Sequence, residues 1–169
     1  MDNVNYKYND INERYKRLNH FTILSISIMA VVVLVYLWFK LANGGINKSL
    51  VYGVTAVVVA ASIINGIINV KNKSNSYLSI AAAIDVYIIY ILIGLQTDAT
   101  FIHYMLFGIL ILQIPYYRKR RMLYTTIGAI VSFILVLVMQ AVHGVSAMDV
   151  NAFCQAMLEL SVIVGIYFA

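Results

Sequence analysis

Six long apolar runs are the feature that most constrains this chain. They cover residues 21–42, 50–69, 78–96, 101–116, 122–142 and 151–169. A helix needs about 20 apolar residues to cross the ~30 Å hydrocarbon core of a bilayer, and most of the runs are close to that length. The runs lack the strict alternation of a membrane β-barrel strand. We therefore expect an all-α fold, a polytopic bundle of six transmembrane helices over residues 21–169.

Composition excludes the common soluble classes. Hydrophobic residues make up 62% of the 169 residues and charged residues 11%, whereas soluble domains have about 45–50% apolar and about 25% charged residues. The chain has one cysteine, so an internal disulfide is impossible. The net charge of +5 raises the question of nucleic acid, but the placement of the basic residues favours a membrane, and no nucleic-acid partner is expected.

The basic residues predict an orientation. Ten of the twelve lysines and arginines fall in segments 1–20, 70–77 and 117–121, and the other two are Lys40 and Lys48. Because cytoplasmic loops of membrane proteins carry an excess of Lys and Arg, these three segments are predicted to be cytoplasmic. With six spans, both termini then lie in the cytoplasm of a multi-pass protein of the cell (plasma) membrane.

The N-terminal arm, residues 1–20, differs from the spans. Four apolar or aromatic residues recur at helical spacing along it, namely Tyr8, Ile11, Tyr15 and Leu18. Such spacing is typical of an amphipathic helix, and a short one at the inner membrane interface is expected here. The alternative is a solvated basic flank of the first span.

Two carboxylates interrupt the apolar runs. Asp85 lies in the third span and Glu159 in the sixth, and each costs about 2.5–3.5 kcal/mol at the centre of a helix in a bilayer. Asn65 and Asn69 on the second span occupy the depth of Asp85, which predicts an intramembrane polar group. Its role is either functional or limited to an interhelical hydrogen bond.

Glu159 is the centre of the predicted ligand site. The other candidates are Gln155, His103, Tyr104, Gln140 and His143. Together they are expected to line a cavity open to the outside that suits a small polar or cationic ligand. The alternative is helix-packing hydrogen bonds and loop histidines. Metal-ligand spacing and nucleophile motifs are missing from the sequence, so neither a metal, a cofactor nor an enzymatic activity is predicted.

The densest charge cluster follows the fourth span. It consists of Arg118, Lys119, Arg120 and Arg121. Anionic lipid of the inner leaflet attracts each basic residue by about 1 kcal/mol. The cluster is therefore predicted to anchor the chain to lipid headgroups and to set its orientation.

Three segments carry a resemblance to a known class. They are the arm NDINERYKRLNHF, the turn IPYYRKRRMLY after the fourth span, and the outer segment HGVSAMDVNAFCQ before a last span without a polar stop. In layout the chain resembles the six-span N-terminal sensory region of Firmicute methyl-accepting chemotaxis receptors, or of related diguanylate cyclase and histidine kinase receptors. The resemblance implies a signal-transducing module that passes a ligand or membrane cue through its sixth helix.

The same resemblance implies partners. Such receptors act as dimers or larger assemblies, and the sixth helix is expected to lead into a cytoplasmic signalling domain. Two alternatives stay open. One is the six-span substrate-binding subunit of a vitamin-type transporter, although the outer loops here are short for that class. The other is an assembly subunit of a larger membrane complex.

Overall fold

Every secondary-structure element among the residues that the structure describes is a helix. The computed structural model describes residues 11–94, 102–116, 118–143 and 150–168. In chain order the elements are α2 (Ile11–Ala42), α3 (Lys48–Lys71), α4 (Leu78–Gly94), α5 (His103–Gln113), the 3-10 helix η2 (Ile114–Tyr116), α6 (Lys119–His143) and α7 (Val150–Phe168). The all-α prediction is confirmed, and each predicted apolar run corresponds to one α-helix.

Three of these helices are long and apolar enough to cross a membrane. They are α2, α3 and residues Lys119–Val142 of α6. The remaining apolar helices are shorter, and α4, with 17 residues, is about 25 Å long at 1.5 Å per residue. Length and composition therefore support three spans directly, while the six-span bundle stays a prediction.

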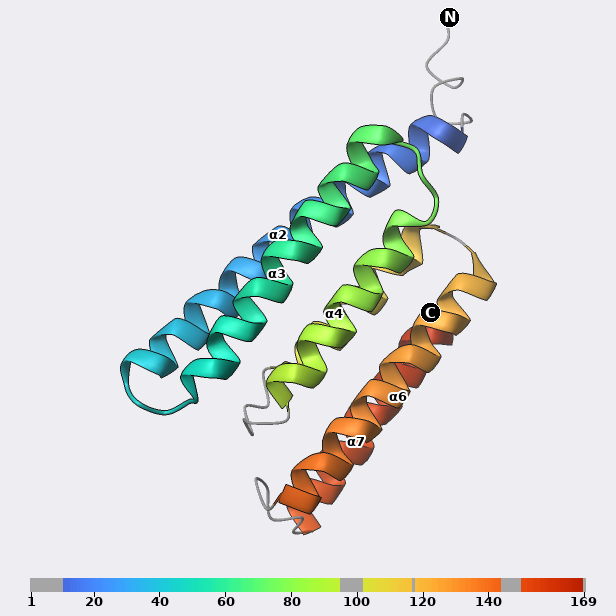
Figure 1. Ribbon diagram of the computed structural model, residues 1–169. Coiled ribbons are helices and arrows are strands. Elements are labelled where there is room, and N and C mark those ends of the chain that lie inside the picture. The colour runs from blue at the N-terminus through green and yellow to red at the C-terminus, as the bar shows by residue number, and fades with distance from the viewer. Residues whose placement is uncertain (1–10, 95–101, 117, 144–149, 169) are drawn as a thin grey trace, which may run out of the picture.

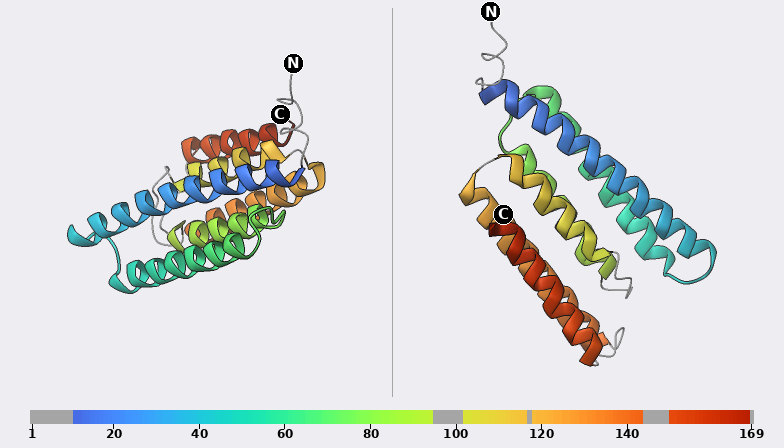
Figure 2. Two further views of the ribbon diagram at one scale, coloured as in Figure 1. Left: turned by 90° about the horizontal axis from the view of Figure 1, so that it is seen from above. Right: turned by 180° about the vertical axis from the view of Figure 1, so that it is seen from behind.

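Consecutive helices run antiparallel and form three hairpins (Figure 1). Viewed from above, the helices form two layers, and each hairpin contributes one helix to each layer (Figure 2). One layer contains α3, α4 and α6, and the other contains α2, α5 and α7. The central helix is α4, which contacts α2, α3, α5 and α6. Nine of its 17 residues are buried, so α4 forms the middle of the core.

Glycine allows the closest helix approaches in this core. A Cβ atom on Gly94 of α4 would lie 2.6 Å from Cγ1 of Val136 on α6. Similarly, a Cβ atom on Gly128 of α6 would lie 2.7 Å from the ring of Tyr87 on α4. Because real Cβ atoms do not approach other carbons this closely, the α4–α6 contact depends on glycine at both positions.

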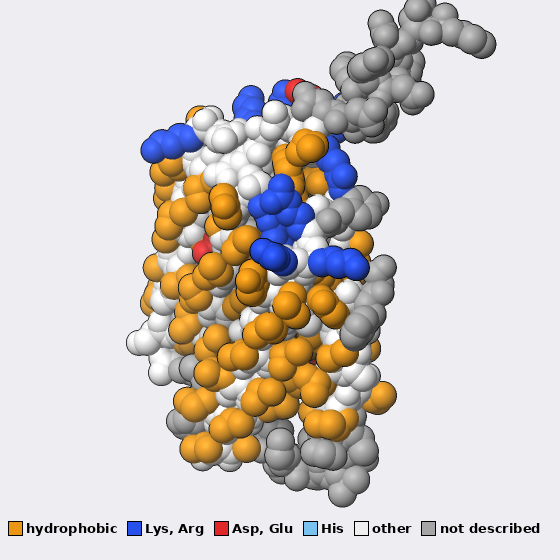
Figure 3. All heavy atoms as spheres, turned by 90° about the vertical axis from the view of Figure 1, so that its right-hand side faces the viewer, with side chains coloured by type: hydrophobic (Ala, Val, Ile, Leu, Met, Phe, Trp, Pro, Cys, Tyr) orange, Lys and Arg blue, Asp and Glu red, His pale blue; other side chains and the backbone are white. Residues whose placement is uncertain are grey.

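The surface of the bundle is apolar. Large hydrophobic side chains on the outer faces of α2 and α3 are about half exposed or more, among them Ile28, Val35, Ile63 and Val70. A helix of a water-soluble bundle has polar residues on that face. Figure 3 shows hydrophobic side chains over most of one side of the molecule. These apolar faces indicate a membrane protein.

Basic side chains gather at one end of the bundle, as Figure 3 also shows. The start of α2, the α3–α4 connection and the start of α6 meet at this end, which we call the basic end. It holds nine of the described basic residues, namely Arg14, Lys16, Arg17, Lys71, Lys73, Arg118, Lys119, Arg120 and Arg121. Lys40 and Lys48 lie at the opposite end, so the three predicted basic segments do share one end.

The N-terminal arm differs from its prediction in one respect. Residues 11–20 are helical, but they form the first turns of α2 instead of a separate short helix. Tyr15 is buried and stacks on Tyr116 of η2 with 5.9 Å between ring centroids. This aromatic contact holds the arm against the bundle. Tyr8 lies outside the described residues.

Candidate functional site

The predicted ligand residues His103, Gln155 and Glu159 come together where α5 meets α7. Nδ1 of His103 lies 3.7 Å from Oε2 of Glu159, and Nε2 of Gln155 donates a 3.0 Å hydrogen bond to Oε1 of the same carboxylate. The side chains of His103 and Glu159 are 12% and 17% exposed. The side chains of His103 and Glu159 are therefore largely shielded by the surrounding helices, whereas Gln155 is exposed.

The offset between α5 and α7 produces this meeting. His103 is the first residue of α5, whereas Glu159 lies nine residues into α7, about 14 Å from its start at 1.5 Å per residue. The start of α5 therefore lies level with the middle of α7. Since the first N–H groups of a helix have no intrahelical partner, this end of α5 favours a nearby negative charge.

Tyr90 of α4 completes the group, although the sequence prediction did not include it. Its hydroxyl lies 2.8 Å from Nδ1 of His103, and the ring of Phe133 on α6 packs edge-on against the imidazole with 5.2 Å between ring centroids. A buried tyrosine hydroxyl needs a hydrogen-bond partner, but the sequence alone does not show which one. The Tyr90–His103–Glu159 group thus joins α4, α5 and α7.

One nitrogen of His103 has two polar neighbours. If Nδ1 carries a hydrogen, it donates to the Tyr90 oxygen; if it does not, it accepts a hydrogen bond from Tyr90. The Glu159 carboxylate, at 3.7 Å, is an electrostatic neighbour of the imidazole. Within the part of the chain that the structure describes, His103 is the sole basic group within 4 Å of the Glu159 carboxylate. Protonation of the imidazole adds an electrostatic attraction between His103 and Glu159.

The other predicted ligand residues do not join this group. Tyr104 is 67% exposed and contacts Phe107 on its own helix. Gln140 is buried and donates a 2.8 Å hydrogen bond to the Gly94 carbonyl at the end of α4. The side chain of His143 lies outside the described residues.

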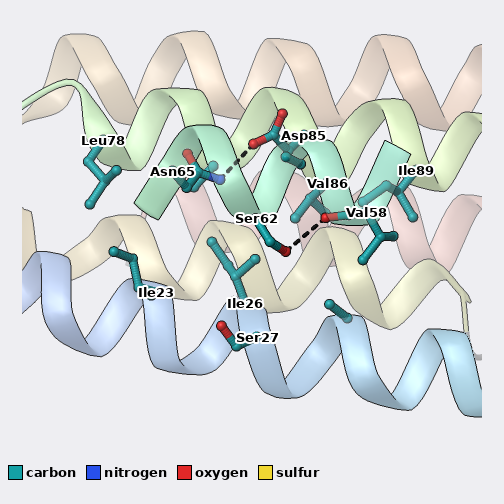
Figure 4. A pocket seen from close by; sticks show the side chains of 13 residues that line it. Ile23, Ile26, Ser27, Val58, Ser62, Asn65, Leu78, Asp85, Val86 and Ile89 are labelled. Carbon is teal, nitrogen blue, oxygen red and sulfur yellow. Dashed lines mark hydrogen bonds between the residues drawn. The ribbon is translucent and has the colours of Figure 1, made fainter. Parts of the chain in front are cut away.

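The polar pair predicted at Asp85 is present. Nδ2 of Asn65 on α3 donates a 2.7 Å hydrogen bond to Oδ2 of Asp85 on α4. Asn69, one turn nearer the basic end, makes no hydrogen bond to Asp85 among the described residues. A crevice lined by α2, α3 and α4 runs beside the pair and includes Ser27 and Ser62 (Figure 4).

A second polar cluster, which the sequence prediction missed, closes the basic end. Nδ2 of Asn19 donates hydrogen bonds to the carbonyls of Lys73 (3.0 Å) and Asn75 (2.8 Å) in the α3–α4 connection. The Tyr116 hydroxyl donates to Oδ1 of Asn19 and also contacts the Thr22 hydroxyl. The one sequence signal for this cluster was the position of Asn19, a polar residue between the basic arm and the first apolar run.

The basic cluster divides into two parts. Arg118, Lys119 and Arg120 are exposed, as lipid anchoring requires. Arg121 is 7% exposed; its guanidinium donates to the Ser76 carbonyl and lies 5.5 Å from the centre of the Tyr77 ring. Arg121 therefore ties α6 to the α3–α4 connection, a position that differs from the predicted contact with lipid.

The described residues contain no group of three or more His, Cys, Asp or Glu side chains that fits a metal ion. The chain matches no protein-family model, and searches of the curated proteins and of the solved structures find no match.

Proposed function

We propose that this chain is a six-span sensory module of a bacterial cell membrane with both termini in the cytoplasm. The basic end is the cytoplasmic end, because Lys and Arg are enriched on that side, and exposed Arg118, Lys119 and Arg120 contact anionic headgroups there. The apolar outer faces of the helices contact lipid. In layout the module resembles the sensory region of chemotaxis and related receptors.

The observation that carries the sensory role is the His103–Glu159 contact between α5 and α7. A small polar or cationic ligand competes with the imidazole and with Gln155 for the Glu159 carboxylate. When the ligand binds, α7 loses one attachment to α5 and the equilibrium between two packings of α7 shifts. A ligand changes such an equilibrium only through different affinities for the two packings.

The signal leaves through α7. This helix runs from the site towards the basic end, where a change in its position or rotation reaches a cytoplasmic output domain or protein. A homodimer or larger assembly would present two or more α7 helices to that partner. The module itself requires no enzymatic activity for this role.

The ligand site is tested with the full chain in lipid nanodiscs and a panel of small protonated amines, including methylammonium and ethanolammonium. At least one probe should raise the thermal unfolding midpoint of the wild type. Glu159→Gln should abolish the response, whereas His103→Gln, which removes the competing imidazole, should retain or strengthen it. Ser161→Ala, which removes an exposed hydroxyl bonded within α7 itself, should retain it. A response that survives in Glu159→Gln contradicts the proposed site.

The transmission step needs a separate measurement. Spin labels at exposed Val164 of α7 and Val70 of α3 report the distance between these helices near the basic end. The effective probe should change the distance distribution in the wild-type background and leave it unchanged with Glu159→Gln. An unchanged distribution in the wild type would remove the signalling role while leaving ligand binding in place.

A further inference from the structure

The crevice beside Asp85 is the second polar feature inside the apolar part of the bundle. It lies between Ile23, Ser27 and Ala30 of α2, the α3 face that carries Ser62 and Asn65, and the inner face of α4. Its volume is about 50 Å³, which is room for about three water-sized occupants. Figure 4 shows Asp85 and Asn65 facing each other, with Ser62 further along the crevice.

Asp85 introduces a negative charge into this apolar setting. It lies seven residues into α4, about 10 Å from the start of the helix. No Lys, Arg or His among the described residues forms an ion pair with it. Because an uncompensated charge in a low-dielectric medium costs several kcal/mol, the carboxylate needs a proton or a cation at this depth.

The neighbouring amide supplies a second oxygen. Asn65 is 7% exposed; Nδ2 donates to Asp85, while the buried Oδ1 has no hydrogen-bond partner within the described structure. A buried carbonyl oxygen without a partner costs about 1–3 kcal/mol. An occupant that this oxygen can bind would remove that cost.

The oxygen donors match one class of ligand. Carboxylate, amide and hydroxyl oxygens suit hard cations, and the crevice offers the oxygens of Asp85, Asn65, Ser62 and Ser27. A single carboxylate balances one positive charge, so a divalent ion would leave the crevice with a net charge. The small volume favours an ion held with a few water molecules.

We propose that the Asp85 crevice is a binding site for a monovalent alkali cation, with Na⁺ favoured by size. The ion binds the Asp85 carboxylate, and water molecules in its coordination shell reach the Oδ1 atom of Asn65 and the hydroxyl of Ser62. Through these ligands the ion joins α3 and α4 and stabilises the folded bundle. This proposal is independent of the ligand site at Glu159.

The test measures the thermal unfolding midpoint of the full chain in detergent micelles as Na⁺ or K⁺ replaces N-methyl-D-glucammonium at constant ionic strength and pH. Na⁺ should raise the midpoint saturably. At about ten times its dissociation constant the rise should be roughly 3–6 °C. An equal midpoint in all three cations overturns the proposal, because the carboxylate then carries a proton.

Variants locate the effect. Asp85→Asn keeps the size of the side chain and its hydrogen bond to Asn65 but should lose the Na⁺ response. Ser62→Ala should weaken Na⁺ binding several-fold, which keeps the test decisive if Asp85→Asn does not fold. Thr55→Val is the matched control, because the Thr55 hydroxyl bonds within α3 and does not line the crevice. A Na⁺ response that is unchanged in Ser62→Ala, or that persists in Asp85→Asn, overturns the site.

Discussion

The hydroxyl of Tyr116 donates a 2.9 Å hydrogen bond to Oδ1 of Asn19, a residue 97 positions earlier in the chain. The same asparagine uses Nδ2 to bind two carbonyls of the α3–α4 connection. One buried amide therefore holds together the start of α2, the α3–α4 connection and η2.

Asn19→Ala should destabilise the protein by about 1–3 kcal/mol, because two backbone carbonyls and the Tyr116 hydroxyl lose a buried partner. The measurement is the free energy of unfolding in mixed micelles. His20→Ala, at the exposed neighbouring position, is the control and should change stability by less than about 0.5 kcal/mol. Equal losses in both variants would contradict the closure.

Gly94→Ala should destabilise the α4–α6 contact by about 1–3 kcal/mol, because the added Cβ overlaps the side chain of Val136. Val136→Ala in the same chain should recover part of that loss. Gly53→Ala is the control, since a Cβ there meets nothing within 4 Å, and it should stabilise α3 by about 0.5–1 kcal/mol. Thermal unfolding of these three variants and the wild type tests the packing.

Tyr90→Phe and Glu159→Gln should not have additive effects on stability. Both remove a neighbour of the same His103 nitrogen, and residues in one network couple by about 0.5–3 kcal/mol. A double-mutant cycle measures this coupling. The control cycle pairs Tyr90→Phe with Ser161→Ala and should be additive within about 0.5 kcal/mol; an additive result in both cycles would show that the group is not coupled.

Arg121→Lys should cost about 1–3 kcal/mol, because a lysine ammonium cannot reproduce the planar guanidinium that bonds the Ser76 carbonyl and lies over Tyr77. Arg120→Lys changes an exposed residue and should be nearly silent. Equal stability of the two variants would place Arg121 among the lipid-facing residues after all.

Epitope tags at the two termini should be accessible to protease from the cytoplasmic side alone. The prediction follows from the basic end, where α2 begins and α7 ends. The measurement compares intact cells with inverted membrane vesicles. External cleavage of either tag would overturn the six-span topology and, with it, the direction of signalling.

Local composition was sufficient to predict where the helices lie in the sequence. The six predicted apolar runs correspond to α2 through α7 with ends that differ by a few residues, except that α2 begins at Ile11 instead of residue 21. That difference has a tertiary cause, because Tyr15 and Asn19 find partners on η2 and the α3–α4 connection. The arm's own spacing predicted a helix, and the contacts of Tyr15 and Asn19 hold that helix in line with the first apolar run.

The sequence predicted some of the contacts between polar side chains but not others. The pair Asp85–Asn65 was predictable, because the short connection between α3 and α4 sets the relative depth of these neighbouring helices. The Tyr90–His103–Glu159 group needed the axial offset between α5 and α7, which no local pattern contains. Gln140 was expected to line the same site, but its side chain binds the Gly94 carbonyl at the end of α4.

The sequence by itself thus determined the number and order of the helices and the end at which the positive charges gather, since both depend on local composition. The tertiary structure alone decided which way each polar side chain faces. His103 and Tyr104 are neighbours in the chain, as are Arg120 and Arg121, but adjacent residues of a helix point about 100° apart. The rotation of each helix about its axis is set by packing against its neighbours, and that rotation turns His103 and Arg121 inward and Tyr104 and Arg120 outward.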